Sequence, residues 1–249
     1  MLCIESLTKH FGGVAAVDQC SFTVAPRQIT ALIGPNGAGK TTVFQCVSGL
    51  LTPDGGRMHL GDRDLTTLPP WERARAGISR TFQQVRLWSY LTVEEHLLLA
   101  LHVQDDRVTA VFGSDTGEQR AAAKRALDRV GLPADLLGRV ASDLSYGQSK
   151  LLELARALLF PHQLLLLDEP VAGVNPALRE QIAEILRSLR ADGETILVIE
   201  HDMDFVRAVA DRVIVMAEGK VLLEGTPAEV LAHPDVIEAY LGVEYAPRN

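Results

Sequence analysis

The chain has 249 residues, 47% of them hydrophobic, which is enough for one large domain or two small ones with a buried core. Its net charge of −8 argues against nucleic acid as a main partner, and its three cysteines, an odd number without metal-type spacing, favour a reducing compartment. No apolar run approaches the roughly 18 residues that span a bilayer and no signal-peptide pattern is present, so the sequence predicts a cytoplasmic protein.

The first third of the chain is predicted to be β-rich. Residues 1–28 alternate polar and apolar side chains, which predicts antiparallel strands. Residues 29–33 are apolar and predict a buried strand. The segment 34–42 then reads GPNGAGKTT and is followed by an apolar helix.

This glycine-rich segment carries the most specific motif of the chain. Gly34, Gly39, Lys40 and Thr41 match the pattern G-x-x-x-x-G-K-[ST] of a phosphate-binding loop. The glycines allow successive N–H groups to point at an anion, Lys40 can reach the β- and γ-phosphates, and Thr41 can place its hydroxyl on Mg²⁺. Because strand, loop and helix occur in the order that the motif requires, we predict a nucleoside triphosphate site rather than a chance glycine-rich loop.

The middle of the chain is predicted to be mainly helical. A short strand at 57–60 and a short helix at 69–76 precede a mixed segment from 78 to about 100. Residues 118–130 are rich in Ala, Lys, Arg and Leu and predict a helix that ends at a Gly-Leu-Pro sequence.

A second anion-binding helix end is predicted at the sequence LSYGQ, residues 144–148. It lies just before an amphipathic helix predicted over 148–160, and Ser145 is a candidate cap for that helix. From this segment alone, an ordinary helix N-terminus is the simpler interpretation.

The last third predicts a parallel α/β core. Apolar strands at 164–167 and 195–199 flank a helix that begins with Asn175 as cap and Pro176 as first residue, and short links between them imply a right-handed parallel arrangement. A hairpin is predicted around Glu218 and Gly219, and a capping box at 226–229 predicts short terminal helices.

Three polar residues follow the predicted core strands, where open parallel sheets bind ligands. Asp168 suits the support of Mg²⁺, and Glu169 can orient or deprotonate an attacking water. His201 can reach a γ-phosphate, although a single histidine at such a place is more often a structural hydrogen-bonding residue.

Together these motifs resemble the ATP-binding subunits of ABC transporters, in the family's order and over nearly the whole chain. The resemblance implies an α/β fold: a P-loop NTPase with a RecA-like core, an antiparallel β subdomain and a helical subdomain at roughly 85–160. One ABC transporter ATP-binding domain would cover 1–249, with short C-terminal helices at roughly 226–242. It also implies that two subunits, identical or different, bind two ATP molecules head to tail, each between the phosphate loop of one and the LSYGQ segment of the other.

The resemblance also implies a role for individual residues. Phe11 would stack on adenine, Gln83 would contact Mg²⁺ and the water, Glu169 would be the general base and His201 would contact the γ-phosphate. The predicted catalytic residues are Glu169, His201 and Gln83, and the predicted metal-binding residues are Thr41, Gln83 and Asp168 for Mg²⁺. The residues predicted to bind ATP are Phe11, Gly34, Asn36, Gly37, Ala38, Gly39, Lys40, Thr41, Thr42, Ser145, Gly147 and Gln148.

A finer resemblance narrows the expected cargo. The sequences RTFQ (80–83), LTVEE (91–95), AGVNP (172–176), IEHD (199–202) and VIEAYLG (236–242) are similar to branched-chain amino acid importers. This implies an ATPase at the cytoplasmic face of the inner membrane that works with permease subunits and, indirectly, with a solute-binding protein. Importers of urea or another amide and exporters of lipid or lipopolysaccharide remain alternatives, because the other subunits choose the cargo.

Two hypotheses from other classes are disfavoured. An ABC ATPase acting on DNA or ribosomes would need long coiled coils or a second cassette, and this chain has neither. A cassette that binds ATP without hydrolysing it would not need Glu169 and His201.

Three departures from the family pattern are Tyr146 in place of a glycine, Asn175 in place of an aspartate, and Arg27 at a turn position usually given to glycine.

The stretch 84–91 is richer in apolar residues than a solvated link requires. Either it packs inside the helical subdomain, or part of it, with Leu87 and Trp88, lines a groove for a helix of a membrane subunit.

Overall fold

The computed structural model describes residues 1–81, 86–101 and 117–244, with side chains up to residue 240. It contains an antiparallel sheet of strand order β2-β1-β4-β5 and a larger sheet of order β10-β9-β3-β8-β7-β6. The strands of the first sheet are β1 (Leu2–Phe11), β2 (Val14–Val24), β4 (Gly55–Leu60) and β5 (Arg63–Asp64). Those of the second are β3 (Ile29–Ile33), β6 (Ile78–Arg80), β7 (Leu164–Asp168), β8 (Ile196–Ile199), β9 (Arg212–Ala217) and β10 (Lys220–Gly225).

The larger sheet is parallel from β9 through β3, β8 and β7 to β6, and only the β9–β10 hairpin is antiparallel. The predicted parallel core and the hairpin at Glu218 and Gly219 are therefore confirmed. Residues 164–167 are all fully buried, which explains why the β7 sequence is continuously apolar rather than alternating.

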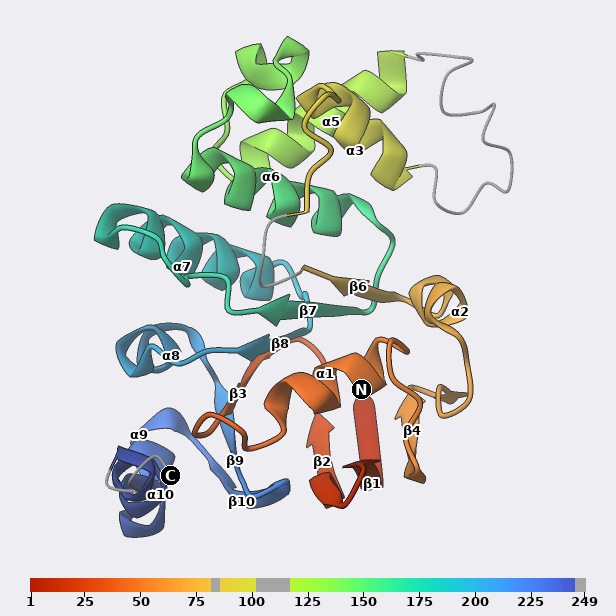
Figure 1. Ribbon diagram of the computed structural model, residues 1–249. Helices are drawn as coiled ribbons and strands as arrows, with labels where there is room; N and C mark the ends of the chain where they lie inside the picture. Colours follow the sequence, from red (N-terminus) through yellow and green to blue (C-terminus); the bar gives the residue numbers. More distant parts are fainter. Residues whose placement is uncertain (82–85, 102–116, 245–249) are drawn as a thin grey trace.

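The two faces of the larger sheet belong to two hydrophobic cores. Leu165 and Leu167 of β7 pack into the core formed with the helices, whereas Leu164 and Leu166 pack against α1 and the antiparallel sheet. This division follows from the twofold alternation of side chains along a strand. The larger sheet therefore lies between the helices that cover one of its faces and the antiparallel sheet with α1 on the other (Figure 1).

A group of helices is inserted between the neighbouring strands β6 and β7 and forms the upper part of the molecule in Figure 1. It contains α3 (Val93–Leu101), α5 (Gly117–Arg129), α6 (Tyr146–Leu159) and the short 3₁₀ helices Ala134–Gly138 and Ala141–Asp143. The other helices are α1 (Lys40–Val47), α2 (Pro70–Arg75), α7 (Pro176–Ala191), α8 (Met203–Val209), α9 (Pro227–Leu231) and α10 (Pro234–Glu244). No helix in the described parts of the chain is long and apolar enough to cross a membrane.

Helix α6 begins earlier than the sequence predicts. Tyr146 to Gln148 form its first turn, not the loop before it, because Ser145 and Gln148 make a capping box at this end. Asn175 and Thr226 cap α7 and α9 as predicted. Arg27 has a φ of 62°, the left-handed conformation that its place in a glycine turn suggested.

Candidate active site

The parallel strands bring the predicted catalytic residues to one edge of the sheet. β8 lies between β3 and β7, so the loop after β3, the acids at the end of β7 and the histidine after β8 come from three neighbouring strands. The register confirms this, since Leu32 and Asp168 both pair with Ile199. Residues more than 130 positions apart in the chain therefore share one site.

The phosphate loop passes very close to the backbone of other strands, which explains its glycines. A Cβ atom on Gly34 would lie 2.1 Å from the Met216 carbonyl oxygen, and one on Gly39 would lie 2.3 Å from the Ala16 carbonyl oxygen. Both glycines also have positive φ angles, as does Gly37. The loop conformation is thus available only to glycine at these positions.

Helix α1 presents an N-terminus that suits an anion. Its cap is Gly39, which provides no side-chain hydrogen bond, and its first turn contains no acidic residue. The N-terminal N–H groups and the positive end of the helix dipole therefore favour a bound phosphate. Asn36, Gly37 and Thr41 are exposed on this loop, whereas Ala38 is buried.

Lys40 lies across the phosphate loop and is 5% exposed. Its ammonium group donates to the carbonyl oxygens of Gly34 at 2.7 Å and Pro35 at 2.8 Å. Burial lowers the pKa of Lys40, and the carboxylate of Glu169 opposes this shift. A cation thus lies between the loop and the acid at the end of β7.

Glu169 and His201 are brought together, with His201 Nε2 2.9 Å from Glu169 Oε1. The backbone of Glu169 continues from β7 by donating to Ile199 O at 3.0 Å, and Lys150 Nζ lies 3.4 Å from the Glu169 carbonyl oxygen. A carboxylate paired with an imidazole at the end of a strand can orient and deprotonate a water molecule.

Asp168 is 4% exposed, and its Oδ2 accepts a hydrogen bond from Arg80 Nη2 at 2.8 Å. Burial raises the pKa of Asp168, while the Arg80 guanidinium opposes this shift. Arg80 also donates to Ser48 Oγ at 2.7 Å, just after α1. The pair therefore connects the ends of β6 and β7 with the phosphate-loop helix.

The second predicted anion site lies on another element, at the N-terminus of α6. Ser145 Oγ accepts from the Gln148 N–H at 3.2 Å, and Gln148 Oε1 accepts from the Ser145 N–H at 2.9 Å, so these two predicted ATP-binding residues bond to each other. A Cβ on Gly147 would lie 2.8 Å from the end of the Leu178 side chain of α7, so this glycine allows the two helices to pack closely.

Two predicted site residues lie apart from these groups. Phe11 ends β1 at the tip of the β1–β2 hairpin and is 49% exposed, with Lys9 Nζ 5.8 Å from its ring centre. Gln83 lies outside the described residues. Their roles stay predictions.

Sequence reasoning assigned no role to Glu200, Arg80 or Lys150. The structure places Glu200 and Lys150 beside Glu169 and His201, and Arg80 beside Asp168. Glu200 is 3% exposed and accepts from the N–H groups of Val171 and His201. Burial raises its pKa to about 6, although the backbone N–H groups oppose the shift. The sequence did offer one signal for Glu200, because it is an acidic residue directly after an apolar strand. An acidic side chain at such a position is usually exposed to solvent, so the signal does not predict a buried role.

The residues present fit Mg²⁺ as well as a nucleotide. Thr41 carries a hydroxyl in the first turn of α1 and Asp168 a carboxylate at the end of β7. Such hard oxygen ligands, together with phosphate oxygens, are those that Mg²⁺ prefers.

Comparisons with known proteins agree with this geometry. Residues 17–172 match the family model described as ABC transporter, and residues 220–246 match the model described as branched-chain amino acid ATP-binding cassette transporter. The high-affinity branched-chain amino acid transport ATP-binding protein LivG of Escherichia coli (strain K12) is 43% identical, over 97% of this chain and 98% of that protein.

Solved structures give the same result. The ADP conformation of MJ1267, an ATP-binding cassette of an ABC transporter, is 34% identical with a TM-score of 0.86, over 97% of this chain and 98% of that one. The dimeric structure of MJ0796, a bacterial ABC transporter cassette, is 26% identical with a TM-score of 0.80, over 91% of this chain and 99% of that one. This chain belongs to the ABC transporter family, as an ATP-binding cassette that hydrolyses ATP.

Proposed function

We propose that this chain powers the import of branched-chain or related amino acids by hydrolysing ATP for separate membrane subunits. The observation that carries the proposal is the similarity to LivG over 97% of the chain, together with the match of residues 220–246 to a model for branched-chain amino acid cassettes. In this role the chain lies at the cytoplasmic face of the inner membrane.

The residues of the candidate active site have separate roles in phosphoryl transfer. The phosphate loop and Lys40 bind the β- and γ-phosphates, and Glu169 takes a proton from the attacking water. His201, 2.9 Å from Glu169, orients that carboxylate and contacts the γ-phosphate. Bound Mg²⁺, for which Thr41, Gln83 and Asp168 are the proposed ligands or supports, would supply neutralisation of the phosphate charge.

The active unit is proposed to be a dimer around two ATP molecules. Supporting this, α6 has a helix N-terminus, predicted to bind an anion, on a different element from the phosphate loop. The similar cassette MJ0796 has a dimeric structure. In such a dimer, Ser145 and Gly147 contact the nucleotide of the partner subunit.

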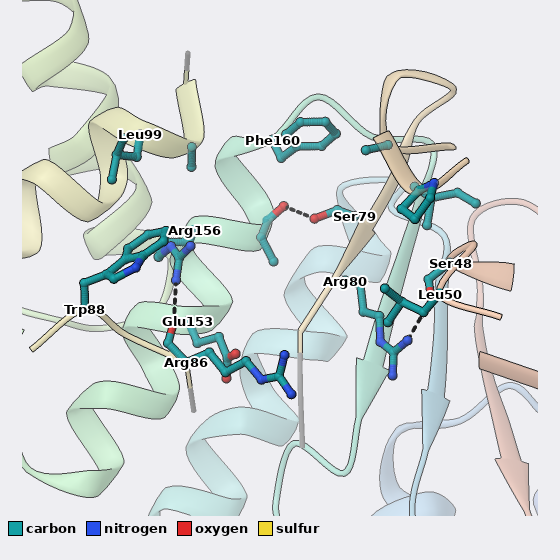
Figure 2. A pocket seen from close by; sticks show the side chains of 15 residues that line it. Ser48, Leu50, Ser79, Arg80, Arg86, Trp88, Leu99, Glu153, Arg156 and Phe160 are labelled. Atoms are coloured by element: carbon teal, nitrogen blue, oxygen red, sulfur yellow. Dashed lines mark hydrogen bonds between the residues drawn. The ribbon is translucent and has the colours of Figure 1, made fainter. Parts of the chain in front are cut away.

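The membrane subunits are proposed to dock in a groove between the helical group and the larger sheet (Figure 2). Its volume is about 590 Å³, and apolar side chains such as Leu50, Trp88, Leu99 and Phe160 line it. Arg156 lies beside Trp88 and donates to the Arg86 carbonyl oxygen at 3.2 Å (Figure 2). A largely apolar groove whose lining also includes charged residues such as Glu153 and Arg156 suits the apolar face of a short amphipathic helix.

The structure separates the two residues that we expected to line this groove. Trp88 is 47% exposed in the groove wall, with Arg156 5.4 Å from its ring centre and His96 5.8 Å away on a tilted plane. Leu87 instead packs against the core of the helical group. The packing interpretation therefore fits Leu87, because its side chain packs against that core, and of these two residues Trp88 lines the groove.

Uptake measurements test the proposed cargo. In cells that lack this chain, uptake of labelled leucine, isoleucine and valine should be lost, and the wild-type chain should restore it while Glu169→Gln should not. Labelled urea and the export of lipid are measured in parallel. Normal leucine uptake in the deletion strain, or a defect confined to urea or to lipid, would contradict the proposal.

A matched pair of variants tests the groove. Leu50 is 51% exposed and lines it, whereas Leu222 on β10 is 40% exposed elsewhere. Leu50→Asp should leave ATP binding intact but abolish co-purification with the membrane subunits, since a charge in an apolar groove opposes docking. Leu222→Asp should assemble normally. Normal assembly of Leu50→Asp would exclude this groove.

A further inference from the structure

The loop between β7 and α7, residues 169–175, is bonded on both sides by side chains from distant segments. Tyr146 Oη, in the first turn of α6, donates to the Ala172 carbonyl oxygen at 3.1 Å. From the other side, Glu200 Oε1 accepts from the Val171 N–H at 2.9 Å. These contacts fix two neighbouring residues of one short loop.

The same loop leads directly to the catalytic pair. Ala172 N–H donates to the Glu169 carbonyl oxygen at 3.1 Å, and Glu200 Oε2 accepts from the His201 N–H at 3.1 Å. Glu169 and His201 then meet at 2.9 Å. Contacts therefore run from Tyr146 through Ala172 to Glu169, and from the neighbouring Val171 through Glu200 to His201.

Glu200 is placed to position other residues, not to touch the reactants. It is 3% exposed, and both carboxylate oxygens accept backbone N–H groups, one from each loop. Burying a carboxylate is costly unless hydrogen bonds compensate it, so a buried acid with only backbone partners is explained by the loops that it joins. Without it, Val171 and His201 have no common anchor.

Tyr146 supplies the contact that glycine, usual at this position of the motif, does not have. The ring is 52% exposed, yet its hydroxyl reaches the loop, 3.6 Å from where a Cβ on Gly173 would lie. Lys150 of the same helix lies with its Nζ 5.9 Å from the Tyr146 ring centre and 3.4 Å from the Glu169 carbonyl oxygen. The N-terminal turns of α6 thus contact the loop at two points.

We propose that Tyr146 and Glu200 are positioning residues that couple the anion-binding end of α6 to the Glu169–His201 pair through residues 169–174. The proposal rests on the proposed dimer, in which α6 contacts the nucleotide bound by the partner subunit. Phosphate at Ser145 then stabilises the loop position in which Glu169 and His201 meet. Hydrolysis in one site thereby depends on occupancy of the other.

Steady-state hydrolysis by the full-length chain tests the coupling with Tyr146→Phe, Glu200→Gln and the double variant. Each single variant should lower kcat by about 5- to 30-fold, as expected for a lost hydrogen bond, and should bring the Hill coefficient for ATP toward one. ATP affinity, measured in a Glu169→Gln background, should stay within about twofold of that background. Tyr90→Phe, which removes the hydroxyl of a tyrosine that is 74% exposed, is the control.

The double variant separates coupling from two unrelated defects. If the two residues act through one loop, its kcat should fall little below that of the worse single variant, whereas independent effects would multiply. Multiplied effects, or a kcat and Hill coefficient of Tyr146→Phe equal to wild type, would overturn the proposal.

Hydrogen exchange without nucleotide gives a second readout that does not depend on transport or turnover. The Val171 amide, bonded to Glu200, should exchange about 5- to 30-fold faster in Tyr146→Phe, although that residue does not touch it. This measurement decides the proposal even if Glu200→Gln fails to fold, and unchanged exchange would contradict it. Because the exchange rate without nucleotide depends neither on dimerisation nor on leucine uptake, failure of the proposed function would leave this result unaffected, and the two failures are distinguishable.

Discussion

Glu169 adopts a left-handed backbone conformation, with φ at 51°, although it carries a side chain. This conformation costs on the order of 1 kcal/mol for a residue other than glycine. Two backbone hydrogen bonds, to Ile199 O at 3.0 Å and from the Ala172 N–H at 3.1 Å, offset that cost. The turn directs the carboxylate toward His201, so the strain lies at the residue assigned as general base.

Replacing Glu169 by Gln keeps the size of the side chain and removes its basicity. We expect phosphate release to fall by roughly 10²- to 10⁴-fold while ATP affinity survives. Glu218→Gln is a matched control, because Glu218 also has a positive φ, 50°, but lies in the exposed β9–β10 turn. Turnover within a factor of two of wild type would show that another group is the base.

Lys40→Ala should act on binding rather than on turnover alone. The ammonium group lies over the phosphate loop and neutralises phosphate charge both before and during the reaction. Because the variant loses the charge-assisted hydrogen bonds from Lys40 to the phosphates, we expect it to bind ATP about 10- to 100-fold more weakly than wild type. Equilibrium titration measures this affinity. Circular dichroism checks that the variant is folded, and an unchanged affinity would contradict the assignment.

Helix α7 begins at an asparagine whose Oδ1 accepts from the Leu178 N–H at 2.9 Å. An aspartate caps a helix equally well, so Asn175→Asp should change the free energy of unfolding by only a few tenths of a kcal/mol, whereas Asn175→Ala should lose about 1 kcal/mol. Urea unfolding of the three proteins measures this. An equal loss in both variants would mean that the amide group has a role beyond capping.

A buried ion pair joins the segment before β7 to the segment before β8. His162 Nε2 lies 3.0 Å from Glu194 Oε2, and His162 Nδ1 lies 2.6 Å from Phe160 O. Burial lowers the pKa of His162, but the hydrogen bonds to Glu194 and Phe160 outweigh it, and the pKa is raised above 6.5. The same pair lowers the pKa of Glu194 below 4.5.

These shifts predict a pH-dependent stability. A raised histidine pKa stabilises the fold fully below pH 6.5, and that contribution is lost as pH rises through the folded-state pKa. Glu194 contributes above pH 4.5 and loses its contribution as pH falls through its own folded-state pKa. Denaturant midpoints between about pH 6 and pH 8 should therefore fall more steeply for wild type than for His162→Gln. Parallel profiles would refute the assignment.

At the scale of the whole molecule, the proposed dimer makes a prediction about assembly. Glu169→Gln protein with ATP and Mg²⁺ should sediment as a dimer, and adding Ser145→Arg should abolish it, because a bulky side chain would enter the interface. Leu222→Arg adds the same bulk at an exposed position of β10, away from the proposed site, so it should still dimerise. A monomer at all ATP concentrations in Glu169→Gln protein would contradict the dimer.

The order of strands and helices could largely be predicted, because buried strands here are short apolar runs and helices begin at Asn175, Ser145 and Thr226 caps. Asp168, Glu169 and His201 could be predicted because each lies within two residues of the end of such a run. Glu200 and the groove could not, since their partners meet only after separate strands pair. The sequence predicts too late a start for α6, because Gly147 is a poor helix former and its contact with Leu178 is invisible in the sequence.

The insertion of the helical group between β6 and β7 has a consequence for how the chain folds. These strands are neighbours, yet their pairing closes a chain segment that runs from residue 81 to 163. Closing so long a segment costs more conformational entropy than forming local contacts within and between the helices. The pairing of β6 with β7 is therefore expected to form slowly. Edge strand β6 is therefore expected to join the sheet late, after the inserted helices have collapsed on one another. Translation order favours the same sequence of events, because β7 is synthesised after both β6 and the inserted helices.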